Sequence, residues 1–380
     1  MEKIKSYINS LFNESDQPTN NDSSPMKFKF KTFITTDSYI NLQFDNINAL
    51  IDDTFTLFKS VSNDFLLIYS YTKDYNIYSL LCYNLIHGQN VTKIAKAHNN
   101  RIYTIRHFLD KINNNDLLLT CSYDKYIKIW NLTNQYTLLY KFCPDYNYKQ
   151  NTYLLSENIL FYNSNIYIIT SAYEINSTGY DILIYEHENL KHENLPNVFE
   201  KMENSTDNTN YLGVYYEQNI PYILAGNLGN VKVFDFSEKK LIYKFDDNNI
   251  KTNYVSIIIK ENEKKGKYLI ASSFDGYLRI WEFNNFNKMI HKIKGGNNNE
   301  YIIGLCLISE RYIIAACSDD IIMQFDLHSN KMVDSFKNHQ HLGNNFLRSY
   351  LLTLKTIDIN DNKYLIIHSN KGTIGLWEKE

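Results

Sequence analysis

Apolar strands that each end in an aromatic residue and a polar turn recur along this chain of 380 residues. Seven segments have this form, with the sequences LLCYN, IKIWN, ILIYE, VKVFD, LRIWE, IMQFD and IGLWE. Their aromatic residues are Tyr83, Trp130, Tyr185, Phe234, Trp281, Phe325 and Trp377. Successive numbers in this series differ by 44 to 55, close to the roughly 40–50 residues of a four-stranded propeller blade. The pattern therefore predicts a repeat architecture.

Within each period the same order of strands recurs. The second period reads IYTIRHF, DLLLTCS, a tight turn, YIKIWNL and YTLLYKF; the fifth reads YVSIIIK, KYLIASS, a tight turn, YLRIWEF and KMIHKIK. Short polar turns between alternating strands indicate antiparallel meanders. One such sheet cannot bury both of its faces, whereas sheets stacked radially can. We therefore expect an all-β fold, a seven-bladed β-propeller of four-stranded antiparallel blades.

The second period resembles the WD40-repeat family, whose blades carry a Gly-His pair, a turn Asp and a Trp-Asp ending. Ala97-His98 stands for the Gly-His pair, Ser122 and Asp124 for the Ser-x-Asp of the hairpin, and Trp130-Asn131 for the Trp-Asp ending. The resemblance implies a structural hydrogen-bond network of His98, Ser122, Asp124 and Trp130, in which His98 bridges Trp130 and Asp124.

Other periods keep less of the family's motif. The fifth has Ser273, Asp275 and Trp281 without an upstream His, and the sixth has Asp319 with an aromatic Phe in the Trp position. The seventh has Ser369 but Lys371 in place of the Asp, and the first, third and fourth periods hold only the hydrophobic skeleton. The resemblance spans residues 26–380, which we expect to form the propeller domain.

The last blade needs an outer strand, because the chain stops at Glu380 just after the seventh aromatic strand. Residues 26–34, MKFKFKTFI, alternate Lys with Phe and precede the first blade. A strand from this segment would close the ring and cover an exposed sheet edge. The alternative for residues 26–34 is an independent hairpin arm.

Residues 1–25 form a separate N-terminal extension in this reading. Five apolar residues recur at the spacing of one helix face, namely Ile4, Tyr7, Ile8, Leu11 and Phe12. The stretch from Asn13 to Pro25 has the polar composition of a disordered linker. The short amphipathic helix could dock a partner, pack on the propeller or touch a membrane surface.

A long polar segment follows the third aromatic strand, over residues 186–210, and contains the duplication HENL. Segments of this length without regular structure are usually functional or disordered. A tolerated insertion and a partner-specific loop remain the two interpretations.

Composition and charge narrow the class of protein. The chain contains 32 Tyr and 21 Phe, which suit pleated sheet surfaces. Its net charge of −3 gives no field that would draw it to nucleic acid. Neither a transmembrane run nor a signal-peptide pattern is seen. The five Cys are odd in number and show no paired spacing. We expect a cytoplasmic protein, with a nuclear location as the alternative.

Catalytic motifs are absent from the sequence. There is no Gly-x-Ser-x-Gly nucleophile turn, phosphate loop or Gly-x-Gly-x-x-Gly motif. The close pair His339 and His341 lacks further ligands placed by sequence, and one of the two fits the family's structural His. The set Ser122, His98 and Asp124 resembles a catalytic triad only in composition. We expect no enzyme activity, no cofactor and no metal.

The resemblance favours a protein–protein interaction scaffold, a subunit of an intracellular hetero-complex. The alternative is a module that recognises a peptide or a modified residue, as a ligase adaptor or mark reader does; a propeller hydrolase is the third. By analogy with the family, partners bind the face where the inter-blade loops and the turn Asp emerge. The candidate partner-binding residues on this face are Arg101, Tyr103, Tyr123, Tyr254 and Phe274.

Overall fold

The computed structural model describes most of the chain in sixteen segments. These are residues 25–34, 55–74, 77–111, 113–143, 152–174, 182–186, 200–202, 209–247, 250–262, 266–283, 288–295, 301–318, 321–337, 351–359, 362–369 and 374–379. All regular elements among them are β-strands. No helix that is long and apolar enough to cross a membrane is found in these segments.

Seven antiparallel sheets of four strands make up the described fold, and we number them as blades 1 to 7 along the chain. Blade 1 comprises β2 (Phe55–Lys59), β3 (Phe65–Asp74), β4 (Ile77–Asn84) and β5 (Gln89–His98). Blade 2 comprises β6 (Ile102–Asp110), β7 (Asn115–Ser122), β8 (Ile127–Asn131) and β9 (Thr137–Phe142). Blade 3 comprises β10 (Thr152–Tyr162), β11 (Asn165–Glu174), β12 (Ile182–Glu186) and β13 (Glu200–Met202).

The remaining four blades repeat this build. Blade 4 comprises β14 (Thr209–Glu217), β15 (Ile220–Asn227), β16 (Asn230–Asp235) and β17 (Lys240–Asp246). Blade 5 comprises β18 (Tyr254–Asn262), β19 (Gly266–Ser273), β20 (Tyr277–Glu282) and β21 (Met289–Lys294). Blade 6 comprises β22 (Ile302–Leu307), β23 (Tyr312–Cys317), β24 (Ile321–Asp326) and β25 (Lys331–Lys337). Blade 7 comprises β26 (Leu351–Ile359), β27 (Asn362–Ser369), β28 (Ile374–Lys379) and the N-terminal β1 (Phe28–Ile34).

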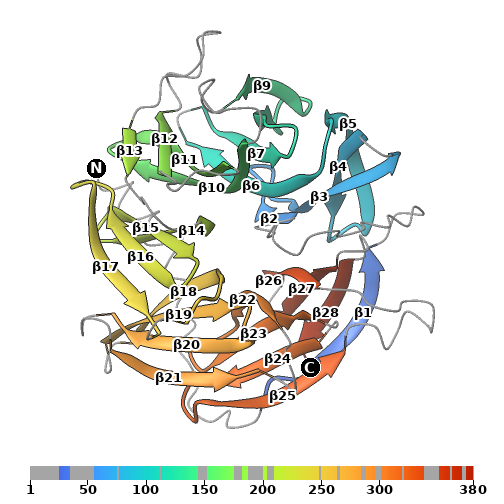
Figure 1. Ribbon diagram of the computed structural model, residues 1–380. Coiled ribbons are helices and arrows are strands. Elements are labelled where there is room, and N and C mark those ends of the chain that lie inside the picture. Colours follow the sequence, from blue (N-terminus) through green and yellow to red (C-terminus); the bar gives the residue numbers. More distant parts are fainter. Residues whose placement is uncertain are drawn as a thin grey trace.

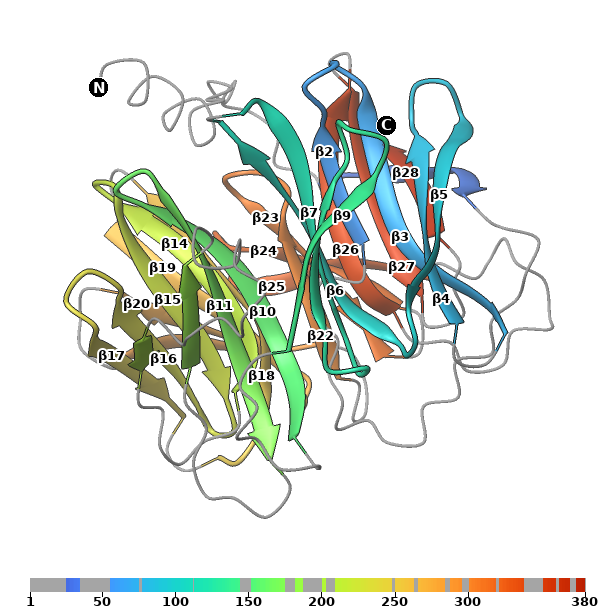
Figure 2. The ribbon, with the colours of Figure 1, turned by 90° about the horizontal axis from the view of Figure 1, so that it is seen from above.

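The blades are arranged in a ring, with the first strand of each toward the centre and the fourth at the rim (Figure 1). Seen at right angles, neighbouring sheets stand face to face (Figure 2). Seven buried apolar clusters fill the spaces between consecutive blades. Each sheet thus buries both faces against its neighbours, which an isolated meander could not do.

The aromatic residues that mark the repeat end the apolar part of each third strand. Six of them are buried, and Tyr185, Trp281 and Phe325 are fully inaccessible. Tyr83 in blade 1 is the exception, because it is only partly buried. The sequence prediction of an all-β, seven-bladed propeller with four-stranded antiparallel blades is confirmed.

Polar links also join the innermost strands of successive blades. The Thr56 hydroxyl accepts a hydrogen bond from the backbone N–H of His107 at 3.2 Å. The Ser156 hydroxyl accepts one from the N–H of Leu212 at 2.9 Å, and the Ser256 hydroxyl accepts one from the N–H of Leu305 at 3.2 Å. These hydroxyls satisfy backbone donors that the sheets leave unpaired, so they hold adjacent blades together at the centre of the ring.

The N-terminal strand closes the ring, as the alternation of Lys and Phe predicts. Strand β1 pairs antiparallel with β28, from Phe28 opposite Lys379 to Ile34 opposite Ile374. Ile34 is 3% exposed in the cluster between blades 7 and 1, and Phe28 packs in the cluster between blades 6 and 7. One strand therefore completes blade 7 and seals both of its flanks.

The structure describes only part of the polar segment 186–210 and of the N-terminal extension 1–25. The polar segment 186–210 contains β13 (Glu200–Met202), which pairs with β12 as the outer strand of blade 3. That part of the segment belongs to the blade and is no insertion; residues 187–199 and 203–208 lie outside the described residues. Residues 1–24, with the expected helix and linker, also lie outside them.

Candidate functional site

One face of the ring carries the loops that lead into each blade and the turns between its second and third strands. In blade 2 these are residues 99–101 and 123–126, and in blade 5 residues 250–253 and 274–276. The two elements meet, because the Tyr123 N–H donates to the Arg101 carbonyl and the Phe274 N–H donates to the Asn253 carbonyl. We call this surface the turn face.

The turn of blade 2 is held by a chain of buried hydrogen bonds. Nδ1 of His98 lies 2.9 Å from a carboxylate oxygen of Asp124, and Nε2 lies 2.8 Å from the hydroxyl of Thr120. The indole N–H of Trp130 donates to the same hydroxyl at 2.9 Å. Asp124 also accepts the backbone N–H groups of Asn99 and Tyr126. The network thus ties the end of β5 to β7, β8 and the turn.

These contacts determine which group donates and which accepts in each hydrogen bond of the network. The Thr120 hydroxyl accepts from Trp130, so it has its own proton to donate to Nε2 of His98. A neutral imidazole then carries its proton on Nδ1 and donates it to Asp124. Burial lowers the pKa of His98 and outweighs the opposing effect of Asp124. The lowered pKa keeps the imidazole ring neutral. Burial would raise the pKa of Asp124, but His98 and the backbone N–H groups of Asn99 and Tyr126 together outweigh this effect, so the net pKa is lowered.

Ser122 differs from the sequence expectation. Its hydroxyl donates to the Asn100 carbonyl at 2.9 Å and accepts the Asp124 N–H at 3.1 Å, so it supports the turn. The link between His98 and Trp130 is made by Thr120 instead. Both residues lie on one face of β7, two positions apart, and the two-residue period of a strand does not discriminate between them.

Thr120→Val should destabilise the protein by about 1–3 kcal/mol, because it leaves the Trp130 N–H and His98 Nε2 buried without a partner. Chemical denaturation of both proteins measures the difference. The matched control is Thr137→Val in the same blade, where the hydroxyl is exposed and donates to Asn134; a change within about 0.5 kcal/mol is expected there. Equal effects of the two substitutions would contradict the network.

Blade 5 uses a different set of residues at the equivalent place. Arg279 on β20 is fully buried and donates to Asp247 at 2.8 Å and to the turn residue Asp275 at 2.9 Å. Lys292 also donates to Asp247 at 2.7 Å. Burial would raise the pKa of both carboxyls, but the hydrogen bonds and charges of Arg279 and Lys292, and for Asp275 also the hydrogen bonds from Ser273 and Tyr277, leave both values lowered. A buried arginine between two carboxylates replaces the missing His.

Sequence reasoning missed Arg279, although a signal was present. A basic residue stands two positions before the closing aromatic residue in blades 2, 4 and 5, as Lys128, Lys232 and Arg279. In an apolar third strand such a residue needs an anionic or carbonyl partner. Lys128 has one in the carbonyl of Ala97.

Two of the proposed partner-binding residues are buried and do not form a binding surface. Tyr103 is 2% exposed, and its hydroxyl donates to the buried carboxylate of Glu157. Tyr254 is fully buried among the apolar residues between blades 4 and 5. For Tyr103 the reason is a register shift between Ile102 and Thr104, which turns the extra residue toward the neighbouring blade.

The other three residues lie half-buried on the turn face. Tyr123 packs its ring against that of Tyr103, with centroids 5.1 Å apart. Phe274 packs against Tyr301 at the entrance to blade 6, also at 5.1 Å. Arg101 lies near the hydroxyls of Tyr123 and Tyr78, and burial lowers its pKa. Tyr301 was not predicted, although it directly precedes β22 as Arg101 directly precedes β6, because the sixth period matches the family's motif less well than the second and fifth.

The described residues contain no group of three or more His, Cys, Asp or Glu that could hold a metal ion. The pair His339 and His341 lies outside them. Ser122, His98 and Asp124 are not arranged for nucleophilic catalysis, since the Ser122 hydroxyl is bonded to a backbone carbonyl and a backbone N–H.

The family described as "WD domain, G-beta repeat" matches residues 88–131. This stretch runs from the outer strand β5 of blade 1 through β8 of blade 2, and it includes the whole network around His98. No curated protein matches the chain.

Proposed function

The chain belongs to the WD40-repeat family, and from this premise we propose that it is a non-enzymatic scaffold that binds other proteins on its turn face. Such propellers generally serve as platforms for protein interaction. We further propose that it acts inside the cell as a subunit of a hetero-complex. Its five cysteines show no spacing typical of a disulfide framework, which supports a location in a reducing compartment.

The observation that supports the turn face most is its set of anchored aromatic side chains. Tyr123, Phe274 and Tyr301 are each partly exposed, and ring contacts hold Tyr123 and the Phe274–Tyr301 pair in place. Aromatic and Arg side chains dominate the binding energy of many interfaces. Side chains already held by packing lose little conformational entropy when a partner binds.

Tyr123→Ala combined with Phe274→Ala should weaken partner binding by about 2 kcal/mol or more, while the propeller stays folded. The measurement is affinity purification with quantified co-purifying proteins, followed by a binding titration of each recovered partner. Thermal unfolding of the variant verifies that the fold is retained.

The matched control places two apolar truncations at the other end of the blades. Phe161→Ala with Leu241→Ala removes side chains that are 39% and 48% exposed, near the turns where β10 ends and β17 begins. Binding equal to wild type is expected. If the Tyr123→Ala, Phe274→Ala variant bound its partners fully and a protein lacking residues 1–12 bound none, the binding site would be the N-terminal segment and not the turn face.

A further inference from the structure

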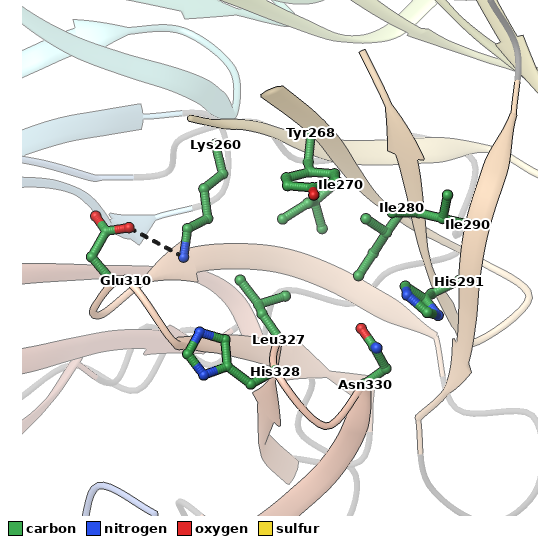
Figure 3. Close-up of a pocket in the computed structure, with 10 residues that line it drawn as sticks. All are labelled: Lys260, Tyr268, Ile270, Ile280, Ile290, His291, Glu310, Leu327, His328 and Asn330. Carbon is green, nitrogen blue, oxygen red and sulfur yellow. Dashed lines mark ion pairs between the residues drawn. The ribbon is translucent and has the colours of Figure 1, made fainter. Parts of the chain in front are cut away.

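A cavity of about 110 Å³ lies between blades 5 and 6, away from the turn face. Its walls come from the end of β18, the middle of β19 and β20, β21, and the two loops at the far end of blade 6 (Figure 3). A polar cavity of this size exceeds the space of one water molecule and approaches that of an engineered site that holds benzene, about 150 Å³. It can accept a small organic group.

A buried lysine provides the positive charge of this cavity. The side chain of Lys260 is 6% exposed, and its ammonium lies 3.5 Å from the carboxylate of Glu310. Glu310 is the one carboxylate paired with Lys260 in the part of the chain that the structure describes, and its own side chain is 65% exposed. An ammonium has three protons to donate, so a single long contact to a solvent-exposed carboxylate leaves much of its capacity unused.

The remaining walls combine apolar side chains with further polar groups. Ile270, Ile280 and Leu327 form the apolar part. Figure 3 shows His291 and Asn330 at the end of the cavity away from Lys260, and Leu327 between Lys260 and Asn330. The cavity thus offers a cation at one end, an apolar middle and further hydrogen-bonding groups at the other end.

We propose that this cavity binds a carboxylate carried on a short, branched apolar group, with the carboxylate on Lys260. The chemistry is shared by a free branched-chain acid and by the C-terminal leucine or isoleucine of a polypeptide. Glu310 already holds a carboxylate oxygen near the ammonium, which shows that an anion can occupy this position. Because the Glu310 side chain is 65% exposed, it can turn to solvent, where water hydrates its carboxylate while the ligand carboxylate takes its place on the ammonium of Lys260.

The test titrates three probes against the full chain by calorimetry, namely 3-methylbutanoate, N-acetyl-leucine and N-acetyl-leucinamide. We expect the two acids to bind and the neutral amide, which lacks the anionic group, to bind at least about tenfold more weakly. If N-acetyl-leucine binds about tenfold more tightly than 3-methylbutanoate, the source is a polypeptide end; the reverse order indicates a free acid. Equal binding of amide and acid, or no binding of either acid up to about 10 mM, would overturn the proposal.

Two substitutions with opposite expected effects tie binding to this cavity. Lys260→Met should weaken binding of the acid by about tenfold or more, because it removes the cation and keeps the bulk. Glu310→Gln should tighten it severalfold, since the competing carboxylate is gone and the residue is exposed. The matched control is Lys267→Met, another buried lysine of blade 5, which is paired with Glu217 and Glu261 and does not line the cavity.

The expected result for Lys267→Met is unchanged affinity, and an affinity loss equal to that of Lys260→Met would contradict the assignment. Weaker binding by Glu310→Gln would do so as well, even if Lys260→Met failed to fold. None of these residues lies on the turn face, so binding of protein partners and binding of the carboxylate can fail independently.

Discussion

Removal of residues 1–35 should yield a protein that fails to form a closed, soluble ring, whereas removal of residues 1–24 should leave the fold intact. The longer truncation deletes β1, exposes the edge of β28 along its whole paired length and uncovers the clusters on both sides of blade 7. An unpaired strand edge is a template for aggregation. Burial of a Phe or Ile side chain stabilises by about 1.5–3 kcal/mol, against a total stability of roughly 5–15 kcal/mol.

A polar contact across the blades adds to this effect. With the Gln324 amide nitrogen directed at the Met26 carbonyl, the amide donates there at 2.9 Å and its oxygen accepts the Met26 N–H at 2.9 Å. Gln324 is on β24 of blade 6 and is 1% exposed. Loss of Met26 would leave this amide buried and unsatisfied. The segment from Met26 to Ile34 is therefore part of the propeller.

Thermal unfolding and size-exclusion chromatography of the two truncations measure the difference. We expect a thermal midpoint near that of the intact chain for the shorter deletion, and aggregation or loss of cooperative unfolding for the longer one. Lys31→Ala in the intact chain is a control within the same strand. It removes an exposed ion pair with Glu378 and should cost about 1 kcal/mol or less. Equal midpoints and solubility for the two truncations would show that β1 does not close the ring.

Arg279→Ala should destabilise the protein by about 3–5 kcal/mol, the second largest effect expected. The substitution leaves Asp275 without its cationic partner and Asp247 with Lys292 alone. Removal of one member of a buried ion pair is costly because the remaining charge stays desolvated. Chemical denaturation at neutral pH gives the value.

The loss should depend on pH with a defined sign. In the intact protein the pKa values of Asp247 and Asp275 are lowered, so their stabilising contribution is present above the ordinary value near 3.8 and is lost as pH falls below it. Without Arg279, burial raises the pKa of Asp275. The difference in stability between the two proteins should therefore shrink as pH falls from 7 toward 4. A difference that stays constant over this range would contradict the ionic account.

Two further variants separate charge from packing. Lys292→Ala removes the outer, 28% exposed partner of Asp247 and should cost about 1 kcal/mol or less. Arg279→Met with Asp247→Asn and Asp275→Asn removes the whole ionic set and should recover much of the stability lost in Arg279→Ala, since no buried charge is left unpaired.

The sequence predicted the architecture because repetition of strand patterns survives where individual motifs are lost. Phe325 and Tyr185 keep the position of Trp130 without keeping its indole N–H, since the site requires apolar bulk between blades in every repeat. The alternation of Lys and Phe before the first blade likewise predicted the closing strand.

Side-chain partners were predicted less well, for identifiable reasons. A register shift in β6 reversed the expected orientation of Tyr103, and strand periodicity contains no signal for such a bulge. Thr120 and Ser122 lie on one face of β7, so the sequence alone does not tell which of the two hydroxyls contacts His98. In the structure the ring of His98 reaches Thr120. The pairing of Arg279 with Asp247 joins residues 32 positions apart, and the packing of blade 5 against blade 4 brings them together.

Amide hydrogen exchange of the protein with and without a recovered partner tests the central claim most directly. The account predicts slower exchange on binding at residues 99–101, 123–126 and 274–276 and around Tyr301, with unchanged exchange at the opposite ends of the blades, such as residues 163–164 and 236–239. Protection confined to those opposite turns or to the outer strands, with the turn face unchanged, would contradict it.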